Sequence, residues 1–325
     1  MTDPIRWGVL GAANFARKTM APAIHNASGA VLAALATSTS EKAAPFRALQ
    51  PDLVVHDSYE ALLADPAIEA VYIPLPNALH VEWTEKAARA GKHVLCEKPI
   101  GLSLADIDRL IALREETGLL IAEAYMIPHH PQWQMVREIV QGSVIGDLLH
   151  IDGYFSFRLQ DAGNIRLDAA LGGGVTRDIG VYTLGAARLV TGQEPAQVVS
   201  RFGWRDGVDV SARIWADYGA TTCSIYMSME APNRQVMTFH GSEGFVELTA
   251  PFNPVSHREA SVRLVRGDGE ERLTRFPNAR QYVAQVEAFG RTLRTGAEYP
   301  VPLEFSRGTQ AALEAAFAGE QAASR

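Results

Sequence analysis

The chain has 325 residues, of which 47% are hydrophobic, and this length is enough for two domains that each bury a core. Its net charge of −7 argues against nucleic acid or an anionic membrane surface as a partner. No stretch is long and apolar enough to cross a bilayer, so no membrane association is expected. The two cysteines, Cys96 and Cys223, both fall in predicted strands, which favours buried thiols in a cytoplasmic protein over a disulfide.

The chain begins with a strand, turn and helix that are typical of nucleotide binding. Residues 5–10 form the predicted strand, and Gly11-Ala12-Ala13-Asn14-Phe15-Ala16 forms the turn. A dinucleotide fingerprint needs small residues for a tight turn, for approach of the backbone to pyrophosphate, and for packing of helix on strand. Alanine replaces two of the three glycines, so an ordinary strand-to-helix turn is the alternative. The predicted cofactor-binding residues of this turn are Gly11, Ala13, Asn14 and Phe15.

The end of the second predicted strand, residues 31–36, bears on the choice of cofactor. An acidic residue there would bind a ribose 2′-hydroxyl and an arginine would accept a 2′-phosphate, but neither is present. The hydroxyls of Thr37, Ser38 and Thr39, with the ammonium of Lys42, would bond a phosphate instead. The sequence therefore favours NADP over NAD, with the alternative that these residues only cap the next helix.

Strands and helices continue to alternate as far as residue 123. Strands are predicted at 70–73 and 119–122, and a helix at 81–90 lies between them. This alternation predicts a doubly wound parallel sheet, which binds ligands at the carboxyl ends of its strands. Glu97-Lys98-Pro99 directly follows another predicted strand, 94–96, so Lys98 is expected at that edge. A lysine there needs an acid or a ligand, although the tripeptide alone would also suit a solvated loop.

The pattern changes after residue 123. From residue 148 onward, predicted strands follow one another without intervening helices, and Gly219 and Pro232-Asn233 supply turns. This succession predicts an open, mainly antiparallel sheet in an α+β domain. The predicted domains are an amino-terminal Rossmann domain at residues 1–123 and a carboxy-terminal α+β domain at residues 124–325.

Candidate catalytic residues lie at the start of a predicted helix in the second half. Asp178 and Tyr182 are four residues apart, so they share one face of that helix. Hydride transfer at a carbinol carbon needs a group that takes or gives the hydroxyl proton. A tyrosine, with an ordinary pKa of about 10, needs a nearby ammonium to favour its phenolate, and Lys98 is the candidate. Asp178 would orient the lysine or the substrate hydroxyl. Without Lys98, a core tyrosine and a capping aspartate would be preferred.

In their order along the chain, these motifs resemble the Gfo/Idh/MocA oxidoreductases over nearly the whole length. The first turn is followed by Pro76-Asn77 with His80, then by Glu97-Lys98-Pro99, then by Asp178 and Tyr182. The resemblance implies that Lys98 lies by the nicotinamide, that Asp178 helps hold substrate, and that Tyr182 is the acid/base. Many members have histidine at the last position. Tyrosine there is similar to the branch that contains dimeric dihydrodiol dehydrogenase, NADP-dependent xylose dehydrogenase and glucose-fructose oxidoreductase.

The resemblance also implies further site residues and a partner. Pro76, Asn77, His80 and Glu97 are expected around the cofactor, with His80 on the nicotinamide ribose unless it only begins a helix. Arg166 is a candidate substrate contact, with a surface arginine as the alternative. The second domain is expected to bind substrate, and the open face of its sheet is expected to form a homodimer or homotetramer contact.

Together these features predict a cytoplasmic NAD(P)-dependent dehydrogenase or reductase that acts on a sugar, cyclic polyol or dihydrodiol. No metal is expected, because the adjacent His129 and His130 would point different ways and no carboxylate spacing suggests a site. Two alternatives stay open. One is an enzyme that uses transient redox chemistry for elimination or rearrangement, and the other is a non-catalytic nucleotide-binding sensor.

Overall fold

The computed structural model describes residues 3–254 and 256–320, which divide into two compact units. The first unit takes the described residues up to His129 together with Arg280–Arg307. The second takes His130–Ala279 and the described residues from Gly308 onward. In this partition residues 124–129 and Arg280–Arg307 belong to the first unit, whereas the sequence-based division at residue 123 assigns them to the second domain.

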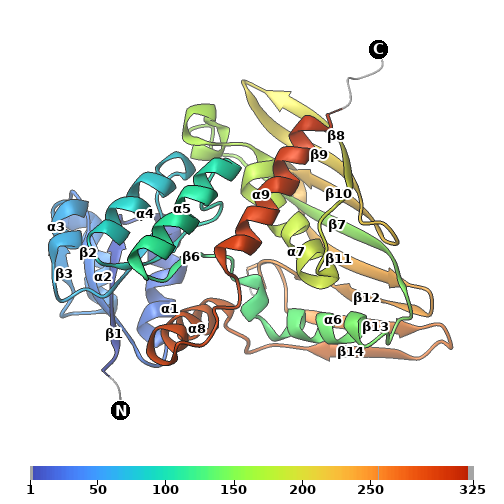
Figure 1. Ribbon diagram of the computed structural model, residues 1–325, viewed down its shortest axis with the longest axis horizontal. Helices are drawn as coiled ribbons and strands as arrows, with labels where there is room; N and C mark the ends of the chain where they lie inside the picture. The colour runs from blue at the N-terminus through green and yellow to red at the C-terminus, as the bar shows by residue number, and fades with distance from the viewer. Residues whose placement is uncertain (1–2, 255, 321–325) are drawn as a thin grey trace. The chain divides into compact units, whose positions relative to one another are not determined.

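The first unit contains six parallel strands in the order β3-β2-β1-β4-β5-β6 (Figure 1). The strand order reverses beside β1, which is where doubly wound sheets bind their ligands. The strands are β1 Ile5–Leu10, β2 Ala30–Ala36, β3 Val54–His56, β4 Ala70–Ile73, β5 His93–Cys96 and β6 Ile121–Glu123. The helices that belong wholly to this unit are α1 Ala21–Asn26, α2 Ser40–Leu49, α3 Tyr59–Ala64, α4 His80–Arg89, α5 Leu104–Thr117 and α8 Gln281–Thr295.

Local chemistry explains where these elements lie. All four residues of β4 are buried, as expected for a parallel strand covered on both faces. The Ser103 hydroxyl accepts a hydrogen bond from the Asp106 N–H to cap α5, and Gly118 ends that helix in a left-handed conformation with φ of 67°. Phe289 of α8 packs its ring 4.9 Å from that of Trp7 in β1. This buried aromatic contact explains why the distant segment belongs with the first sheet.

The second unit contains an eight-stranded sheet in the order β14-β13-β12-β11-β7-β10-β9-β8. Its strand pairs are antiparallel except for the parallel pair of β7 and β10, so the expectation of a mainly antiparallel sheet is confirmed. The strands are β7 Leu148–Arg158, β8 Gln197–Arg205, β9 Val208–Asp217, β10 Thr222–Ser228, β11 Glu230–Gly241, β12 Gly244–Leu248, β13 Ser261–Arg266 and β14 Glu271–Arg275. The helices are α6 Pro131–Gln141 and α7 Val181–Thr191, and α9 Leu303–Ala318 joins this unit from Gly308 onward.

One face of this sheet is covered and the other is open. Figure 1 shows α6 and α7 on the same side of the sheet, where they contact β12, β13 and β7. In β9, the residues Ala212, Ile214 and Ala216 are buried, whereas the alternating Arg213 and Trp215 are exposed. Among the described residues, no helix covers the face that carries Arg213 and Trp215.

The predicted turn at Pro232-Asn233 is wrong, because both residues lie inside β11. The register of β11 against β7 shifts between Glu230 and Arg234, so Pro232 sits in a bulge. A proline has no N–H to donate to a ladder, and a bulge is one of the places where a strand tolerates it. Gly219 does form the predicted turn, with φ of 86°.

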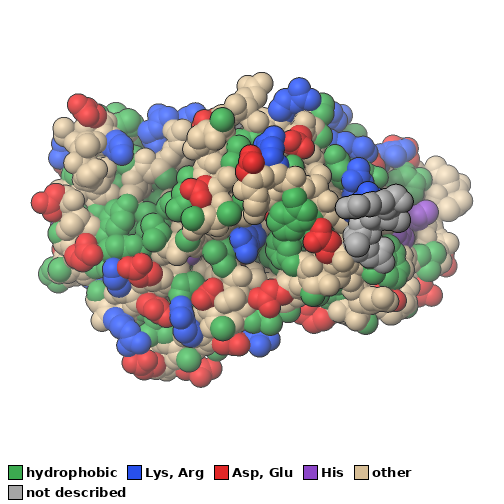
Figure 2. Space-filling view, turned by 90° about the horizontal axis from the view of Figure 1, so that it is seen from above, with side chains coloured by type: hydrophobic (Ala, Val, Ile, Leu, Met, Phe, Trp, Pro, Cys, Tyr) green, Lys and Arg blue, Asp and Glu red, His purple; other side chains and the backbone are tan. Residues whose placement is uncertain are grey.

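Charges of both signs are distributed over the surface. In the view of Figure 2, lysine and arginine side chains and aspartate and glutamate side chains are both scattered over the face shown. Within the described part of the chain, no helix is long and apolar enough to cross a membrane.

Candidate functional site

A cavity of about 480 Å³ lies at the carboxyl ends of the central strands of the first unit. Six of the residues predicted to bind cofactor line this cavity, namely Gly11, Ala13, Thr37, Ser38, Lys42 and Pro76. Sequence reasoning missed the other contributors, which are Ala12, Asp57, Ser58, Tyr59, Glu60, Pro74 and Leu75. The structure therefore brings together the ends of β1, β2, β3 and β4, as a dinucleotide site requires.

Gly11 gives the first turn its shape. Its φ of 107° is a conformation that side chains disfavour, and a Cβ added there would lie 3.1 Å from the Tyr59 hydroxyl. The chain then enters a π-helical turn, Ala16–Met20, which continues into α1. A turn without a side chain beside a helix amino terminus fits the pyrophosphate of a dinucleotide.

Asn14 and Phe15 do not line this cavity. The Asn14 side chain accepts a hydrogen bond from the Arg17 guanidinium at 3.0 Å. Phe15 is 39% exposed, and its ring packs edge-on against Tyr282 of α8 at 5.6 Å. Their cofactor contact therefore stays a prediction.

The residues after β2 serve two purposes. Thr39 caps α2, since its hydroxyl accepts a hydrogen bond from the Lys42 N–H at 3.4 Å. Thr37 and Ser38 precede this cap and line the cavity together with Lys42. The capping alternative thus accounts for Thr39 but leaves the neighbouring hydroxyls available to a ligand.

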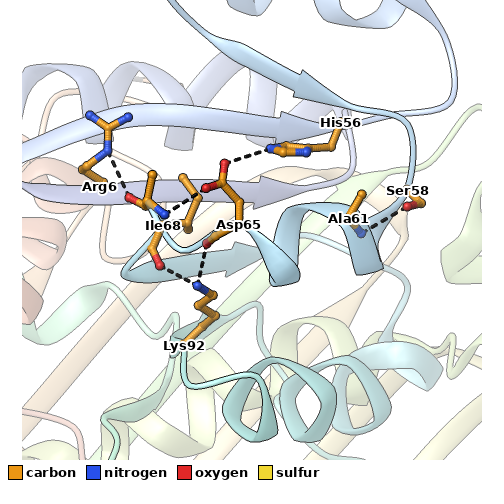
Figure 3. A network of polar contacts seen from close by, with 8 residues as sticks. Arg6, His56, Ser58, Ala61, Asp65, Ile68 and Lys92 are labelled. Atoms are coloured by element: carbon orange, nitrogen blue, oxygen red, sulfur yellow. Dashed lines mark hydrogen bonds and ion pairs between the residues drawn. The ribbon is translucent and has the colours of Figure 1, made fainter.

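A polar network supports the loop that carries Asp57, Ser58 and Tyr59 into the cavity (Figure 3). His56 Nε2 lies 3.3 Å from Asp65 Oδ2, which makes an ion pair when the imidazole is protonated. The buried Lys92 ammonium donates to the carbonyls of Asp65 at 2.7 Å and Ile68 at 2.8 Å. These contacts fix the segment between α3 and β4, and through His56 they hold the end of β3.

Lys98 follows β5 at the expected edge of the sheet, and the Lys98–Pro99 peptide bond is cis. The Glu97 carboxylate accepts hydrogen bonds from the Tyr72 hydroxyl at 2.7 Å and from the Lys98 backbone N–H at 3.3 Å. Burial raises the pKa of Glu97, while the charge of Lys98 acts in the opposite direction. Glu97 is therefore placed to fix the backbone of Lys98.

His80 begins α4 and is fully buried. Its Nδ1 lies 2.7 Å from the Pro99 carbonyl and its Nε2 lies 2.7 Å from the Leu75 carbonyl. Burial lowers the pKa of His80, against the effect of these two carbonyls. Both ring nitrogens lie against backbone carbonyls, so His80 links the Leu75 and Pro99 loops. Its contact with the nicotinamide ribose stays a prediction. Asn77 lies in the single 3₁₀ turn that precedes this helix.

The candidate substrate residues lie together in the second unit. Arg166 Nε donates to Asp178 Oδ2 at 2.6 Å, and Asn164 Oδ1 lies 3.5 Å from the same guanidinium. The side chain of Arg166 is 39% exposed and that of Asp178 is 11% exposed. Arg166 is therefore not an unattached surface arginine, because its guanidinium is oriented by a nearly buried carboxylate.

Tyr182 lies one turn further along the same helix. Asp178 belongs to a π-helical turn, Thr176–Gly180, that runs into α7, so the spacing is not that of a regular α-helix. Tyr182 is 8% exposed, and its ring lies 5.9 Å from Phe155 and 5.7 Å from Phe252. The aromatic neighbours restrain the ring, which a proton-transfer group requires.

Lys98 belongs to the first unit, whereas Asp178 and Tyr182 belong to the second. The predicted action of Lys98 on Tyr182 therefore stays a prediction.

The adjacent histidines His129 and His130 contact different partners. His129 Nε2 lies 3.5 Å from the Tyr299 hydroxyl, and His130 Nδ1 accepts a hydrogen bond from the Gln132 N–H. Among the described residues, no three potential metal-ligating side chains form a cluster.

The fold and its cavity define a dinucleotide-binding oxidoreductase, and comparison with known proteins agrees. Residues 5–125 match the model of an oxidoreductase family with an NAD-binding Rossmann fold, and residues 133–247 match the GFO/IDH/MocA C-terminal domain. The chain belongs to the Gfo/Idh/MocA family and is an NAD(P)-dependent oxidoreductase. The family prediction is confirmed, and the non-catalytic alternative is set aside.

Relatives of known activity cover almost the whole chain. A dTDP-3,4-didehydro-2,6-dideoxy-alpha-D-glucose 3-reductase of Streptomyces violaceoruber is 37% identical over 295 residues, which are 89% of this chain and 85% of the relative. A D-xylose 1-dehydrogenase (NADP(+)) of Haloferax volcanii is 35% identical over 315 residues, or 96% of each chain. The crystal structure of a 3-ketoreductase from Actinomadura kijaniata in complex with NADP and TDP-benzene is 31% identical, covers 98% of each chain and has a TM-score of 0.89.

Proposed function

We propose that the protein transfers a hydride between NADP and a carbinol or carbonyl carbon of a sugar. The observation that carries this proposal is the placement of Arg166, Asp178 and Tyr182 around the start of one restrained helix. Guanidinium and carboxylate groups bond sugar hydroxyls, and a phenol can exchange the proton of the reacting hydroxyl. The sugar substrates named for the relatives support the same class. Assay of reduced-nicotinamide absorbance with a panel of free and nucleotide-linked keto sugars and aldoses tests it.

Each side chain has a distinct role in this proposal. The bound nicotinamide supplies or accepts the hydride. Tyr182 gives the proton to the carbonyl oxygen in reduction and takes it from the hydroxyl in oxidation. Asp178 and Arg166 orient the sugar hydroxyls, and the charge of Lys98 favours the phenolate form of Tyr182.

Burial of free Cys96 and Cys223 supports the cytoplasmic setting that the sequence predicts.

NADP is the proposed cofactor because Thr37, Ser38 and Lys42 meet in the cavity without a neighbouring acid on β2. We expect wild-type protein to bind NADPH more tightly than NADH in a fluorescence titration. Lys42→Ala should weaken NADPH binding about tenfold, the effect of losing one charge-assisted hydrogen bond, and leave NADH binding unchanged. Lys86→Ala is the matched control, since Lys86 is a surface lysine paired with Glu82 on α4. An equal loss of affinity for NADPH and NADH in the Lys42 variant would contradict the choice of NADP. It would favour NAD, with Asp57 or Glu60, which also line the cavity, as the acid that binds the ribose.

We further propose that a second copy of the chain covers the open face of the eight-stranded sheet. Across this face, Arg201, Arg213, Tyr226 and Tyr154 lie in register on β8, β9, β10 and β7. Arg213 lies 5.3 Å from the Tyr226 ring, and Trp215 is 38% exposed nearby. Aromatic and arginine side chains on an uncovered face are typical of interfaces.

Trp215→Glu should dissociate such an assembly, because it would place a carboxylate in the apolar part of the contact. Sedimentation velocity should show an oligomer for wild type and a monomer for the variant at the same concentration. Val54→Glu, at an exposed valine of β3, is the control and should sediment like wild type. A monomeric wild type would contradict the proposal.

A further inference from the structure

A buried carboxylate lies behind the start of the helix that carries Asp178 and Tyr182. Asp209, near the beginning of β9, is 2% exposed. Its Oδ2 accepts a hydrogen bond from the Thr176 N–H at 2.8 Å. Thr176 is the first residue of the π-helical turn. The first N–H groups of a helix lack carbonyl partners within it, so a side chain can accept from them. A side chain from a distant strand thus caps the candidate catalytic helix.

Gly174 makes room for this carboxylate. A Cβ built on Gly174 would lie 2.1 Å from Asp209 Oδ1, and its φ of 117° is a conformation that side chains disfavour. Gly174 also connects the two substrate residues through its backbone. Its N–H donates to the Arg166 carbonyl at 2.9 Å, and its carbonyl accepts from the Asp178 N–H at 3.1 Å. The position of Gly174 therefore sets the distance between the backbones of Arg166 and Asp178.

The electrostatics suit a carboxylate in this place. Burial raises the pKa of Asp209, while the hydrogen bond from Thr176 and the charge of Arg177 act in the opposite direction. The amino terminus of a helix favours negative charge. Gly173 restricts the loop further, since a Cβ there would lie 2.5 Å from the Arg166 carbonyl oxygen.

We propose that Asp209 is a positioning residue for the sugar site: through Thr176 and Gly174 it fixes the relative placement of Arg166 and Asp178. This inference rests on the proposed function. Asp209 itself would touch neither substrate nor cofactor. It holds the pair of side chains that orient the sugar hydroxyls, and a small displacement of such a pair is costly for turnover.

The test compares Asp209→Ala with Asp209→Asn. Alanine removes the acceptor for the Thr176 N–H, so kcat/KM for the sugar should fall about tenfold to a hundredfold, mainly through a higher KM. Asparagine keeps an acceptor oxygen of similar position, so it should restore most of that loss. NADPH affinity, which depends on the first unit, should be unchanged in both variants.

A matched control separates positioning from stability. Thr309 is 3% exposed in the same unit, and its hydroxyl accepts a hydrogen bond from Arg188 at 2.6 Å. Thr309→Val should lower the melting temperature without changing the sugar KM. If Asp209→Ala changes the KM no more than Thr309→Val does, or if Asp209→Asn gives no rescue, the positioning role is overturned while the proposed function stands.

Amide hydrogen exchange gives an outcome that does not depend on turnover. The amides of Gly174 to Asp178 should exchange about tenfold faster in Asp209→Ala than in wild type, and at the wild-type rate in Thr309→Val. Absence of turnover by wild type on every sugar would overturn the proposed function alone. Unchanged exchange in Asp209→Ala would overturn the inference.

Discussion

Tyr182→Phe is expected to lower kcat about 10²-fold to 10⁴-fold, the usual contribution of a general acid or base. The substitution removes only a hydroxyl, and the ring contacts with Phe155 and Phe252 remain. NADPH affinity should be unchanged, because the candidate cofactor cavity belongs to the first unit. Steady-state kinetics with a sugar substrate and a fluorescence titration with NADPH measure the two effects separately.

Tyr218→Phe is the matched control for this variant. Tyr218 is 5% exposed in the same unit, and its hydroxyl is one of the buried polar atoms without a hydrogen-bond partner within the described structure. Its removal should leave kcat at the wild-type value. Full activity in Tyr182→Phe would contradict the proton-transfer role. Packing against Phe155 and Phe252 would then be the only role of the Tyr182 ring.

Lys98→Ala is expected to reduce turnover strongly and to move the pH profile upward. A positive charge favours the phenolate of a neighbouring tyrosine, so its loss means that a higher pH is needed for deprotonation. In the oxidation direction, where phenolate is the base, the rising limb should shift to higher pH. In the reduction direction, where the phenol is the acid, the falling limb should shift to higher pH as well. Rates measured in both directions across a pH series give these limbs.

Lys98→Arg separates charge from position in this experiment. It keeps the positive charge, so it should retain the wild-type limbs even if a longer side chain lowers kcat. An unchanged profile in Lys98→Ala would mean that Lys98 does not act on the titrating group. Its role would then be limited to holding cofactor or substrate.

The fold of the first unit could be predicted well because its signals are local. Strands such as Ala70–Ile73 are continuous apolar runs, and serine caps and left-handed glycines mark the helix ends. The strand Val54–His56 was not predicted, since three residues carry no periodicity. For that reason Asp57 and Tyr59 were also missed as residues that line the cavity.

The second unit was less accessible to sequence reasoning. In β14 the charged residues Glu271, Arg272 and Arg275 are exposed, so this strand lacks the alternation of a half-buried strand. The return of α8 to the first unit depends on the contact of Phe289 with Trp7, which no local pattern reveals.

The candidate site shows the same division between local and distant effects. The residue types at Lys98, Asp178 and Tyr182 indicated chemistry because their identities and order are unusual together. The contacts of His80 with two backbone carbonyls, and the hydrogen bond from the Thr176 N–H to Asp209, join segments that are apart in sequence. A single sequence carries no signal for these contacts, which give His80 a supporting role beside its predicted one.

Net hydride transfer between nicotinamide and a sugar carbon is the reaction on which the proposed function depends. The most direct measurement supplies NADPH that carries deuterium at the transferred position, together with a keto sugar that the enzyme converts. We expect loss of reduced-nicotinamide absorbance in equal amount to product, with deuterium at the new carbinol carbon. Product formed with no net change in that absorbance, from enzyme that retains its cofactor, would contradict it and identify transient redox chemistry instead.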